Sequence, residues 1–480
     1  MRVGSVIHII SFLLMFLAAT MLLPIPFSLF YHANDAVPLL LSAAITLIIG
    51  FLGFRFTEFD RDLRPKEGFA IVTFSWIGLS AFGCLPFILS GAIPSVTDAF
   101  FETMSGFSTT GATILTDVAG LSHGLLFWRS LTHWIGGMGI IVLSLAILPF
   151  LGVGGMQLFK AEVPGPVTDR LTPRIMETAK ILWGVYVLFT AVQTALLMFA
   201  GMNLFDALCH AFGTLATGGY STRNGSVGEF NSAFIDWITI AFMLLAGTNF
   251  SLHYRFLRGD FKAYFRNAEF LLFLSLIGLA TVLISADTLI VHYEDGVHGF
   301  RDTLFQVVSI LTTTGFGTAD YENWAFSSQF VLFILMFIGG CAGSTGGGIK
   351  IMRVHVLVKF VFSEITRLIH PHAVVPVRVG PHPIDREIVA KVVGFFIMFV
   401  MIFVFGVFVM TFLGLDMATS FGATAACLSN IGPGLGAVGP TDNYAHIPAF
   451  GKWFLCLLML LGRLEIYTVI ILFSPSYWKK

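Results

Sequence analysis

Four short segments containing glycine recur along this chain of 480 residues, and their composition suits the binding of a small cation by backbone oxygens. They read TTGAT (109–113), ATGGY (216–220), TTGFG (313–317) and NIGPG (430–434). Glycine permits the positive φ that turns successive carbonyl oxygens the same way. A ring of such oxygens can replace the water shell of a monovalent cation. Threonine adds hydroxyl groups that can anchor each segment.

Aligned on their third residue, the four segments lie roughly 100 residues apart, which is typical of an internal repeat. The candidate ligands are the aligned glycine and the residue before it in each segment: Thr110, Gly111, Thr217, Gly218, Thr314, Gly315, Ile431 and Gly432. The alternative is that these glycines only allow helices to pack closely. Four segments in register favour the cation site.

The elements that hold these segments must be membrane helices. Hydrophobic residues make up 56% of the chain and charged residues 11%, too few to cover a soluble surface. A net charge of -1 with no basic cluster gives no indication of nucleic-acid binding. A crossing needs roughly 20 apolar residues. Ten stretches qualify: 5–30, 36–55, 67–92, 126–152, 178–202, 231–254, 268–291, 326–361, 388–413 and 447–473. The first is interpreted as a retained span because its apolar run exceeds that of a usual signal peptide.

Four shorter apolar stretches precede the glycine segments, at 97–108, 204–216, 300–313 and 416–429. They are too short to span, so we expect re-entrant half-helices. An aspartate stands near each start, where it suits an N-cap and the positive end of the helix dipole: Asp98, Asp206, Asp302 and Asp416. The last lies furthest from its glycine, which predicts an extra turn in the fourth half-helix.

Most of the 27 Lys and Arg residues lie on connections opposite the glycine segments, so this side is predicted to face the cytoplasm. The glycine face holds only Arg129, Arg223, Arg301 and Lys452. Basic connections recur after every pair of spans, which indicates four units inserted in the same direction. Non-helical backbone at membrane depth must be buried or line a water-filled path. We therefore expect four segments around a pseudo-fourfold axis.

The predicted fold is an all-α polytopic membrane protein with four parallel membrane–pore-helix–membrane repeats and an extra N-terminal helix pair. The expected divisions are 1–66 for the helix pair, then 67–160, 161–262, 263–372 and 373–480 for the repeats. The five cysteines lie in apolar surroundings without metal spacing and are interpreted as small core residues. The histidines at positions 123, 133, 210 and 253 are likewise interpreted as packing residues.

The eighth span is interrupted by GGCAGSTGGG (339–348). Glycine costs about 1 kcal/mol relative to alanine inside a helix, so we expect an irregular loop on the cytoplasmic side of the glycine segments. A nucleotide-binding P-loop is excluded because Lys350 lacks the required Gly-Lys-Ser/Thr context. A glycine kink that serves helix packing is the alternative.

Arg463 lies inside the last span, where a charge costs at least about 2.5–3.5 kcal/mol. It should therefore face a cavity or a partner, and Glu465, two residues away, points to a different face. We expect a fixed positive charge in the path that contacts the 343–348 loop when the path is closed. A buried structural ion pair elsewhere is the alternative.

The whole chain resembles the Trk/Ktr/HKT superfamily of potassium transporters, most closely its bacterial TrkH type, in the four glycine segments, GGCAGSTGGGIK (339–350) and LLGRLEIYT (460–468). The resemblance implies potassium coordination at the eight candidate ligands, and Gly111 favours potassium because members that pass sodium often have serine there. It also implies an intramembrane gate loop. The implied gate residues are Gly343, Ser344, Thr345, Gly346, Gly347, Gly348, Lys350 and Arg463.

Relative to symmetric potassium channels, only the third and fourth segments keep a second glycine, Gly317 and Gly434, and Asn430 and Ile431 replace threonines. A shorter and less selective filter is therefore expected. The predicted function is gated, channel-like potassium uptake, with potassium as transported ligand, no cofactor and no enzymatic activity. The alternative is a symporter coupled to protons or sodium, for which Glu465 is the clearest membrane carboxylate.

The resemblance further implies a homodimer in the plasma membrane, here the bacterial inner membrane, with one pore in each protomer. It implies cytosolic nucleotide-binding TrkA-type subunits as regulators. The basic connections at 160–180, 255–266 and 350–391 are their expected docking surface, or else ordinary positive-inside loops.

Overall fold

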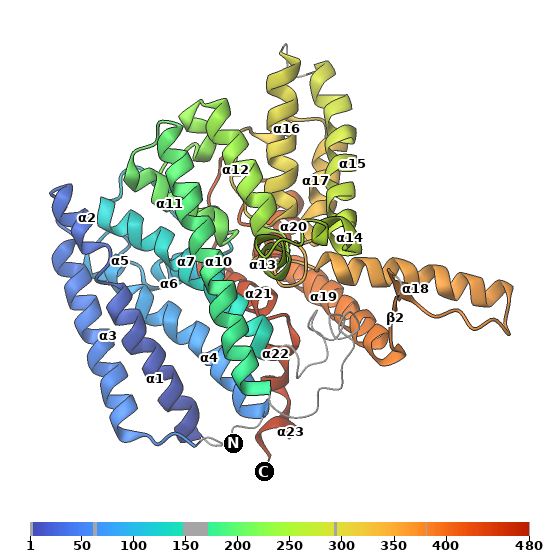
Figure 1. The fold of residues 1–480 in the computed structure, drawn as a ribbon. Coiled ribbons are helices and arrows are strands. Elements are labelled where there is room, and N and C mark those ends of the chain that lie inside the picture. The colour runs from blue at the N-terminus through green and yellow to red at the C-terminus, as the bar shows by residue number, and fades with distance from the viewer. Residues whose placement is uncertain (1–2, 61–64, 147–170, 292–294, 381, 480) are drawn as a thin grey trace.

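The computed structural model describes residues 3–60, 65–146, 171–291, 295–380 and 382–479 (Figure 1). Within them the fold is an all-α membrane protein, as predicted, apart from one short hairpin. In this hairpin β1 (Arg378–Val379) pairs antiparallel with β2 (His382–Pro383).

The helices follow the predicted order of a helix pair and four repeats. In the pair, α1 (Val3–Thr20) and α2 (Ile25–Phe30) together form one span, and α3 (Ala36–Phe56) forms the other. Repeat 1 consists of α4 (Pro65–Gly83), α5 (Leu85–Leu89), α6 (Val96–Phe107) and α7 (His123–Ala146). Repeat 2 consists of α10 (Leu171–Phe199), α11 (Leu204–Leu215), η1 (Ser226–Phe230), α12 (Ala233–Ala246) and α13 (Phe250–Leu257), and the short α14 (Ala263–Arg266) leads into repeat 3.

Repeat 3 consists of α15 (Ala268–Val291), α16 (Gly296–Leu311), η2 (Tyr321–Asn323), α17 (Phe326–Phe337) and α18 (Ile351–Ile369). Repeat 4 consists of α19 (Arg386–Phe412), α20 (Met417–Leu428), α21 (Ala449–Arg463), α22 (Tyr467–Ile470), η3 (Ile471–Phe473) and α23 (Pro475–Trp478). The divisions stay predictions. The one expected at 66/67 falls inside α4, and the one at 160/161 lies outside the described residues.

By length and composition, six helices of the described chain can cross a membrane. They are Val3–Phe30, Ala36–Phe56, Lys66–Leu89, Glu177–Phe199, Ala268–Thr288 and Arg386–Phe412. Two further predicted spans are bent pairs: α12 and α13 meet at 102°, and α21 and the α22–η3 segment at 114°. The predicted span at 326–361 is interrupted at its glycine run, as expected: α17 ends at Phe337 and α18 begins only at Ile351. The span predicted at 126–152 corresponds to α7, whose continuation beyond Ala146 lies outside the described residues.

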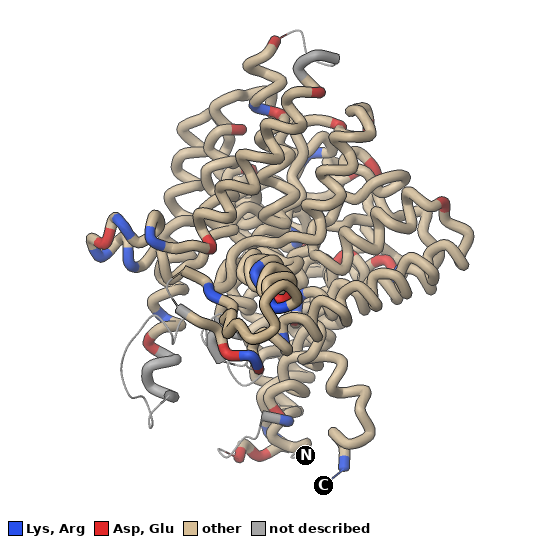
Figure 2. The backbone as a smooth tube through the Cα atoms, turned by 90° about the vertical axis from the view of Figure 1, so that its right-hand side faces the viewer, with Lys and Arg blue, Asp and Glu red and all other residues tan. Residues whose placement is uncertain are grey.

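The repeats close into a circle. α7 packs on α11, α12 on α16, α17 on α20, and α21 returns to α6. Both termini lie at one end of the molecule, and α18 projects from the body (Figure 1). Figure 2 shows Lys and Arg gathered mainly in the half that holds the termini, as the positive-inside interpretation expects for a cytoplasmic side.

Two predictions about the half-helices were wrong: that each aspartate is an N-cap, and that the fourth half-helix has an extra turn. Only Asp416 is an N-cap; Asp98 and Asp206 lie in the first turn, and their amide groups donate to the N-caps Ser95 and Asn203. α6, α11 and α20 each have 12 residues, so the fourth has no extra turn. The extra turn belongs to the third: α16 has 16 residues and begins after Asp295, which leaves Asp302 inside the helix.

The N-terminal helix pair is fixed to repeat 1 by the buried Asp35. Its carboxylate accepts the amide of Leu125 at 2.9 Å, near the start of α7, and the hydroxyls of Ser28 and Ser122 also donate to it. An acid from another unit therefore satisfies an otherwise unpaired N–H of α7.

Asp35→Ala should destabilise the protein by about 2 kcal/mol, because the helix loses its cap and the hydroxyls of Ser28 and Ser122 lose an acceptor. Thermal unfolding in detergent should show a midpoint lower by about 2 °C. Asp385→Ala is the matched control, because Asp385 precedes α19 without making a side-chain cap hydrogen bond. Equal midpoints for the two variants would contradict the assignment.

Candidate ion path

The four half-helices end in the same backbone conformation. One residue past each helix C-cap, φ is positive at Thr109 (53°), Thr217 (52°), Thr313 (59°) and Asn430 (56°). Two residues further on, a glycine again has positive φ: Gly111 (84°), Gly219 (77°), Gly315 (79°) and Gly432 (99°). The left-handed region costs a residue with a side chain about 1–2 kcal/mol. Glycine avoids this cost at the second of the two positive-φ positions in each segment.

This geometry corrects the alignment of the second segment by one residue. Gly219, rather than Gly218, corresponds to Gly111, and Gly218 occupies the position of Thr110. The hydrogen bonds agree, because the amides of residues 110, 218, 314 and 431 each donate to the carbonyl five residues back at 2.8–2.9 Å. With this register, Ser95, Asn203 and Asp416 lie at equal sequence distances before their glycines.

The four segments converge on a closed ring. A Cβ on Gly111 would lie 2.1 Å from the carbonyl oxygen of Gly218. The same contact joins Gly219 to Thr314 at 2.1 Å. It continues from Gly315 to Ile431 at 1.9 Å and from Gly432 to Thr110 at 2.7 Å. Each glycine thus abuts a carbonyl of the next repeat in chain order, and the last returns to the first. Inward carbonyl oxygens in such a ring can coordinate a dehydrated monovalent cation.

Three buried tyrosines support the segments, two of them by joining neighbouring repeats. The Tyr220 hydroxyl donates to the carbonyls of Glu102 at 2.8 Å and Ala112 at 3.2 Å, which joins repeats 2 and 1. The Tyr321 hydroxyl donates to Gly434 at 2.8 Å, which joins repeats 3 and 4. The Tyr444 hydroxyl donates to Gly432 at 2.7 Å within repeat 4. The sequence showed no periodic signal for these residues.

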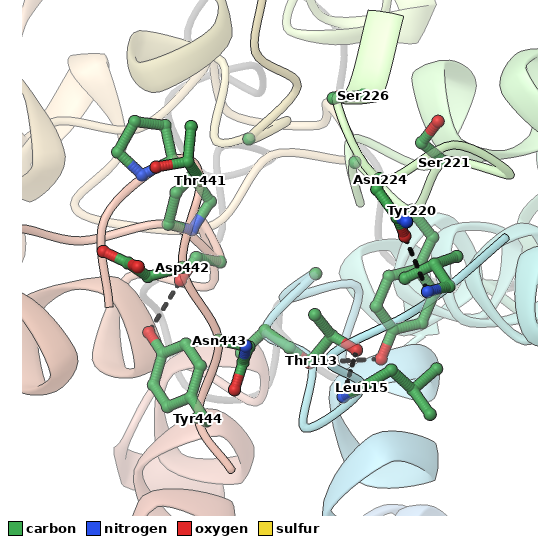
Figure 3. Close-up of a pocket in the computed structure, with 18 of the residues that line it drawn as sticks. Thr113, Leu115, Tyr220, Ser221, Asn224, Ser226, Thr441, Asp442, Asn443 and Tyr444 are labelled. Atoms are coloured by element: carbon green, nitrogen blue, oxygen red, sulfur yellow. Dashed lines mark hydrogen bonds between the residues drawn. The ribbon is translucent and has the colours of Figure 1, made fainter. Parts of the chain in front are cut away.

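A cavity of about 130 Å³ opens above the ring. Figure 3 shows Thr441, Asp442 and Tyr444 of repeat 4 on one side and Tyr220 and Asn224 of repeat 2 on the other. Gly111, Gly219, Gly315 and Gly432 also line it. The cavity therefore lies at the outer mouth of the ring.

The four basic residues predicted on this face are all paired with acids. Arg129 meets Glu102 at 2.7 Å, and Arg223 meets Asp206 at 3.3 Å. Arg301 meets Asp236 at 3.0 Å, and Lys452 meets Asp98 at 2.6 Å. Their charges are thus compensated locally, and they do little to repel a cation that approaches the mouth.

Two acids of the outer loops, Glu322 and Asp117, have pKa values shifted from their usual range. Burial raises the pKa of Glu322, and Asp320 and Asp442 add to the rise, while the Gly436 N–H opposes it. The amide side chain of Asn224 lowers the pKa of Asp117 by a hydrogen bond. The neighbouring carboxylates disfavour the ionised form of Glu322, whereas a cation close to Glu322 would favour it, because opposite charges attract.

The glycine loop, defined as residues 338–350, lies directly beneath the ring. The Gly347 amide donates to the Thr313 hydroxyl at 2.7 Å, and a Cβ on Gly347 would lie 2.2 Å from the Ser429 carbonyl oxygen. The Thr345 hydroxyl donates to the carbonyl of Leu215 at 2.9 Å. The loop therefore contacts the C-terminal ends of three half-helices from below.

Two cations hold this loop. Arg463, which is 2% exposed, donates to the carbonyls of Thr345 at 2.6 Å and Gly136 at 3.2 Å. Lys350 donates to the Gly346 carbonyl. Glu465 does not pair with Arg463, as expected; its partner is Arg353 on α18. Within the described residues Arg463 has no carboxylate partner, so the alternative of an ion pair elsewhere is not supported.

The other predicted loop residues lie in the same segment. The Ser344 hydroxyl donates to the Cys341 carbonyl at 2.6 Å. Gly343 has φ of 76° and faces Asn249, and Gly348 has φ of 61° and faces Gly339. All eight residues expected to form a gate are therefore close together beneath the ring.

Sequence reasoning missed the elements against which the loop packs. At the break between α12 and α13, the Gly247 carbonyl accepts the Cys341 amide at 2.8 Å, and the Phe250 amide donates to Gly343 at 3.1 Å. The buried carboxylate of Glu269 accepts the amide of Ala342 at 2.7 Å. The available signals were Gly-Thr-Asn (247–249) inside a predicted span and a lone acid at the start of another.

Comparisons with known proteins point to a single family. The model of the TrkH family, described as "Cation transport protein", matches residues 39–480. The "Trk system potassium uptake protein TrkH" of Halomonas elongata is 42% identical, and that of Escherichia coli K12 is 40% identical, each over the full length of both chains. The crystal structure of the potassium transporter TrkH from Vibrio parahaemolyticus superposes with a TM-score of 0.93 at 39% identity and covers all of both chains.

Proposed function

The chain belongs to the TrkH family of cation transport proteins, and we propose that it takes up potassium through the ring, by channel-like permeation under the control of the glycine loop. The observation that carries the proposal is the closed ring of backbone carbonyls contributed by all four repeats. A multi-pass membrane protein with such a ring needs no catalytic group, and transport relatives of this identity are not enzymes.

The proposed ligands are backbone oxygens of the ring residues. In repeats 1, 3 and 4 we propose the residues that the sequence predicts: Thr110, Gly111, Thr314, Gly315, Ile431 and Gly432. In repeat 2 the corresponding pair is Gly218 and Gly219, and Thr217 lies one step closer to its helix. Potassium is the transported ligand.

The proposed gate is the glycine loop, with Arg463 as its main anchor. A loop wedged beneath the ring blocks the path, and a guanidinium at that level repels cations. Opening requires the loop to release the Thr345 carbonyl from Arg463 and the Gly347 amide from Thr313.

A symporter coupled to protons or sodium is the alternative. The membrane carboxylate considered for a relay, Glu465, is paired with Arg353. The buried acids Glu102 and Glu269, which the sequence did not single out, accept hydrogen bonds from Arg129 and from backbone amides. These acids have structural partners, which favours permeation without a proton relay.

We also propose a homodimer and cytosolic partners of the TrkA type. The projecting α18 exposes Val361, Phe362, Ile365 and Leu368, and a second copy is the proposed cover for this apolar face. The basic segment at α13 and α14, which protrudes at the left of Figure 2, is the proposed docking surface for regulators. Relatives named as parts of a Trk system support a multicomponent assembly.

The test is cation flux into liposomes that contain the purified protein, with Gly111→Ser beside the wild type. Serine at this position needs φ of 84° and would push its Cβ against the Gly218 carbonyl, so potassium preference over sodium should fall about tenfold. Gly91→Ser is the matched control, because Gly91 has φ of 74° with no atom within 4 Å. An unaltered potassium-to-sodium ratio in Gly111→Ser would remove this segment from the filter.

A further inference from the structure

The corrected register leaves repeat 2 without a side chain at one ring position. Thr110, Thr314 and Ile431 occupy this position in the other repeats, and Gly218 occupies it here. Gly218 has no positive φ, so its backbone would accept a side chain. What excludes one is His133: a Cβ on Gly218 would lie 2.3 Å from its Nδ1 and 2.6 Å from its Cε1 and Cγ. The imidazole thus fills the volume that a side chain takes elsewhere.

The threonines at the equivalent positions anchor their own segments. The Thr110 hydroxyl lies 2.7 Å from that of Ser108 and accepts from the Asn430 amide group at 2.9 Å. The Thr314 hydroxyl lies 2.7 Å from that of Thr312. Repeat 2 has no such side chain and needs support from outside its own segment.

His133 supplies this support from α7 of the neighbouring repeat. Its ring, fully buried, stacks on Tyr220 with centroids 3.9 Å apart and planes at 13°. The Arg129 guanidinium lies 3.4 Å from the centre of the same tyrosine ring. Two groups this close to one ring must lie on opposite faces of it. Arg129 and His133 are one helical turn apart, so α7 holds Tyr220 between them.

His133 acts here through the volume of its ring rather than through strong hydrogen bonds. His133 Nε2 has no hydrogen-bond partner among the described residues, and its Nδ1 is 3.5 Å from the Tyr220 amide nitrogen. A hydrocarbon ring would fill the same volume without leaving a buried polar atom unpaired. Glu102 completes the support, because it pairs with Arg129 and its backbone carbonyl accepts the Tyr220 hydroxyl.

We propose that His133 is a positioning residue that determines ion specificity: its imidazole replaces the missing side chain at Gly218 and fixes the carbonyls of Gly218 and Gly219 in the ring. The proposal rests on the proposed function of the ring as a potassium filter. It makes repeat 2 dependent on repeat 1 for its shape, whereas the threonine positions of repeats 1 and 3 are anchored by their own side chains.

The experiment is a double-mutant cycle measured by potassium, rubidium and sodium flux in liposomes. His133→Ala should lower the potassium-to-sodium ratio about tenfold, and Gly218→Thr should do the same because the threonine collides with the imidazole. The double variant restores a threonine in a vacated space, so it should recover most of the wild-type ratio. His133→Phe, which keeps a ring, should stay within about twofold of the wild type.

His123→Ala is the matched control, because it removes another histidine–tyrosine stack, with Tyr31 at 3.8 Å, away from the ring. It should leave the ratio unchanged. A purely structural role for His133 would lower the flux of all three cations together and leave their ratio intact, which would overturn the proposal. A double variant no better than either single variant would also overturn it. Failure of the filter itself is distinguishable, because the wild type would then show no potassium preference.

Discussion

Gly315→Ala should abolish most potassium uptake, whereas Gly317→Ala, two residues along the same segment, should be tolerated. Alanine at position 315 must adopt φ of 79°, and its Cβ would lie 1.9 Å from the Ile431 carbonyl oxygen. The added Cβ would collide with a backbone atom, so the collision can be removed only if the backbone of the ring moves. At Gly317 φ is not in the left-handed region, and the nearest atom to an added Cβ is 3.8 Å away.

We expect Gly315→Ala to lower the rate of rubidium uptake by at least about tenfold, since the strain and the displaced ligand act on the same site. Growth of a potassium-uptake-deficient bacterium at low potassium gives a second readout. The two variants need equal membrane abundance for the comparison. Uptake at the wild-type rate by Gly315→Ala would show that the ring is not the ion path.

Arg463→Ala should raise cation flux in the absence of any activating partner. The guanidinium makes two hydrogen bonds, to the Thr345 carbonyl in the glycine loop and to the Gly136 carbonyl on α7. A hydrogen bond to a charged group contributes about 1.5–3 kcal/mol, so loss of the bond to Thr345 should shift the loop about tenfold or more toward its open state. Removal of the positive charge also lowers the electrostatic barrier to cations.

The measurement is flux into liposomes without added regulators. Arg55→Ala, which removes an exposed arginine in the last turn of α3, is the control for loss of one positive charge. Arg463→Gln tests the charge separately, because the amide can still donate one hydrogen bond. Wild-type flux from a correctly folded Arg463→Ala protein would contradict the gate.

Much of this arrangement was predictable because it depends on composition and local backbone preference. The four glycine segments, the half-helices, the glycine loop and the isolated charge of Arg463 all leave marks in the sequence. The register of repeat 2 was not predictable in this way, since Gly218 and Gly219 are adjacent and chemically identical. Only the positive φ of Gly219 and the position of His133 separate them.

The bends inside the predicted spans at 231–254 and 447–473 were also missed, and the second has a different reason. Residues 464–466 carry no proline or glycine, yet Glu465 and the β-branched Ile466 both have positive φ. Such strain persists only when the surroundings impose it, here with Glu465 held by Arg353 of α18. Likewise, Asp302 could be taken for an N-cap because the true cap, Asp295, lies one helical turn earlier than the other repeats suggest.

The ring closes through a contact between the fourth repeat and the first. Gly432 abuts Thr110, and the Asn430 side chain donates to the Thr110 hydroxyl across 320 positions. During synthesis, repeats 1 to 3 are inserted before this last contact can form. A chain that ends before the fourth repeat therefore cannot close the ring and lacks one quarter of its carbonyl oxygens.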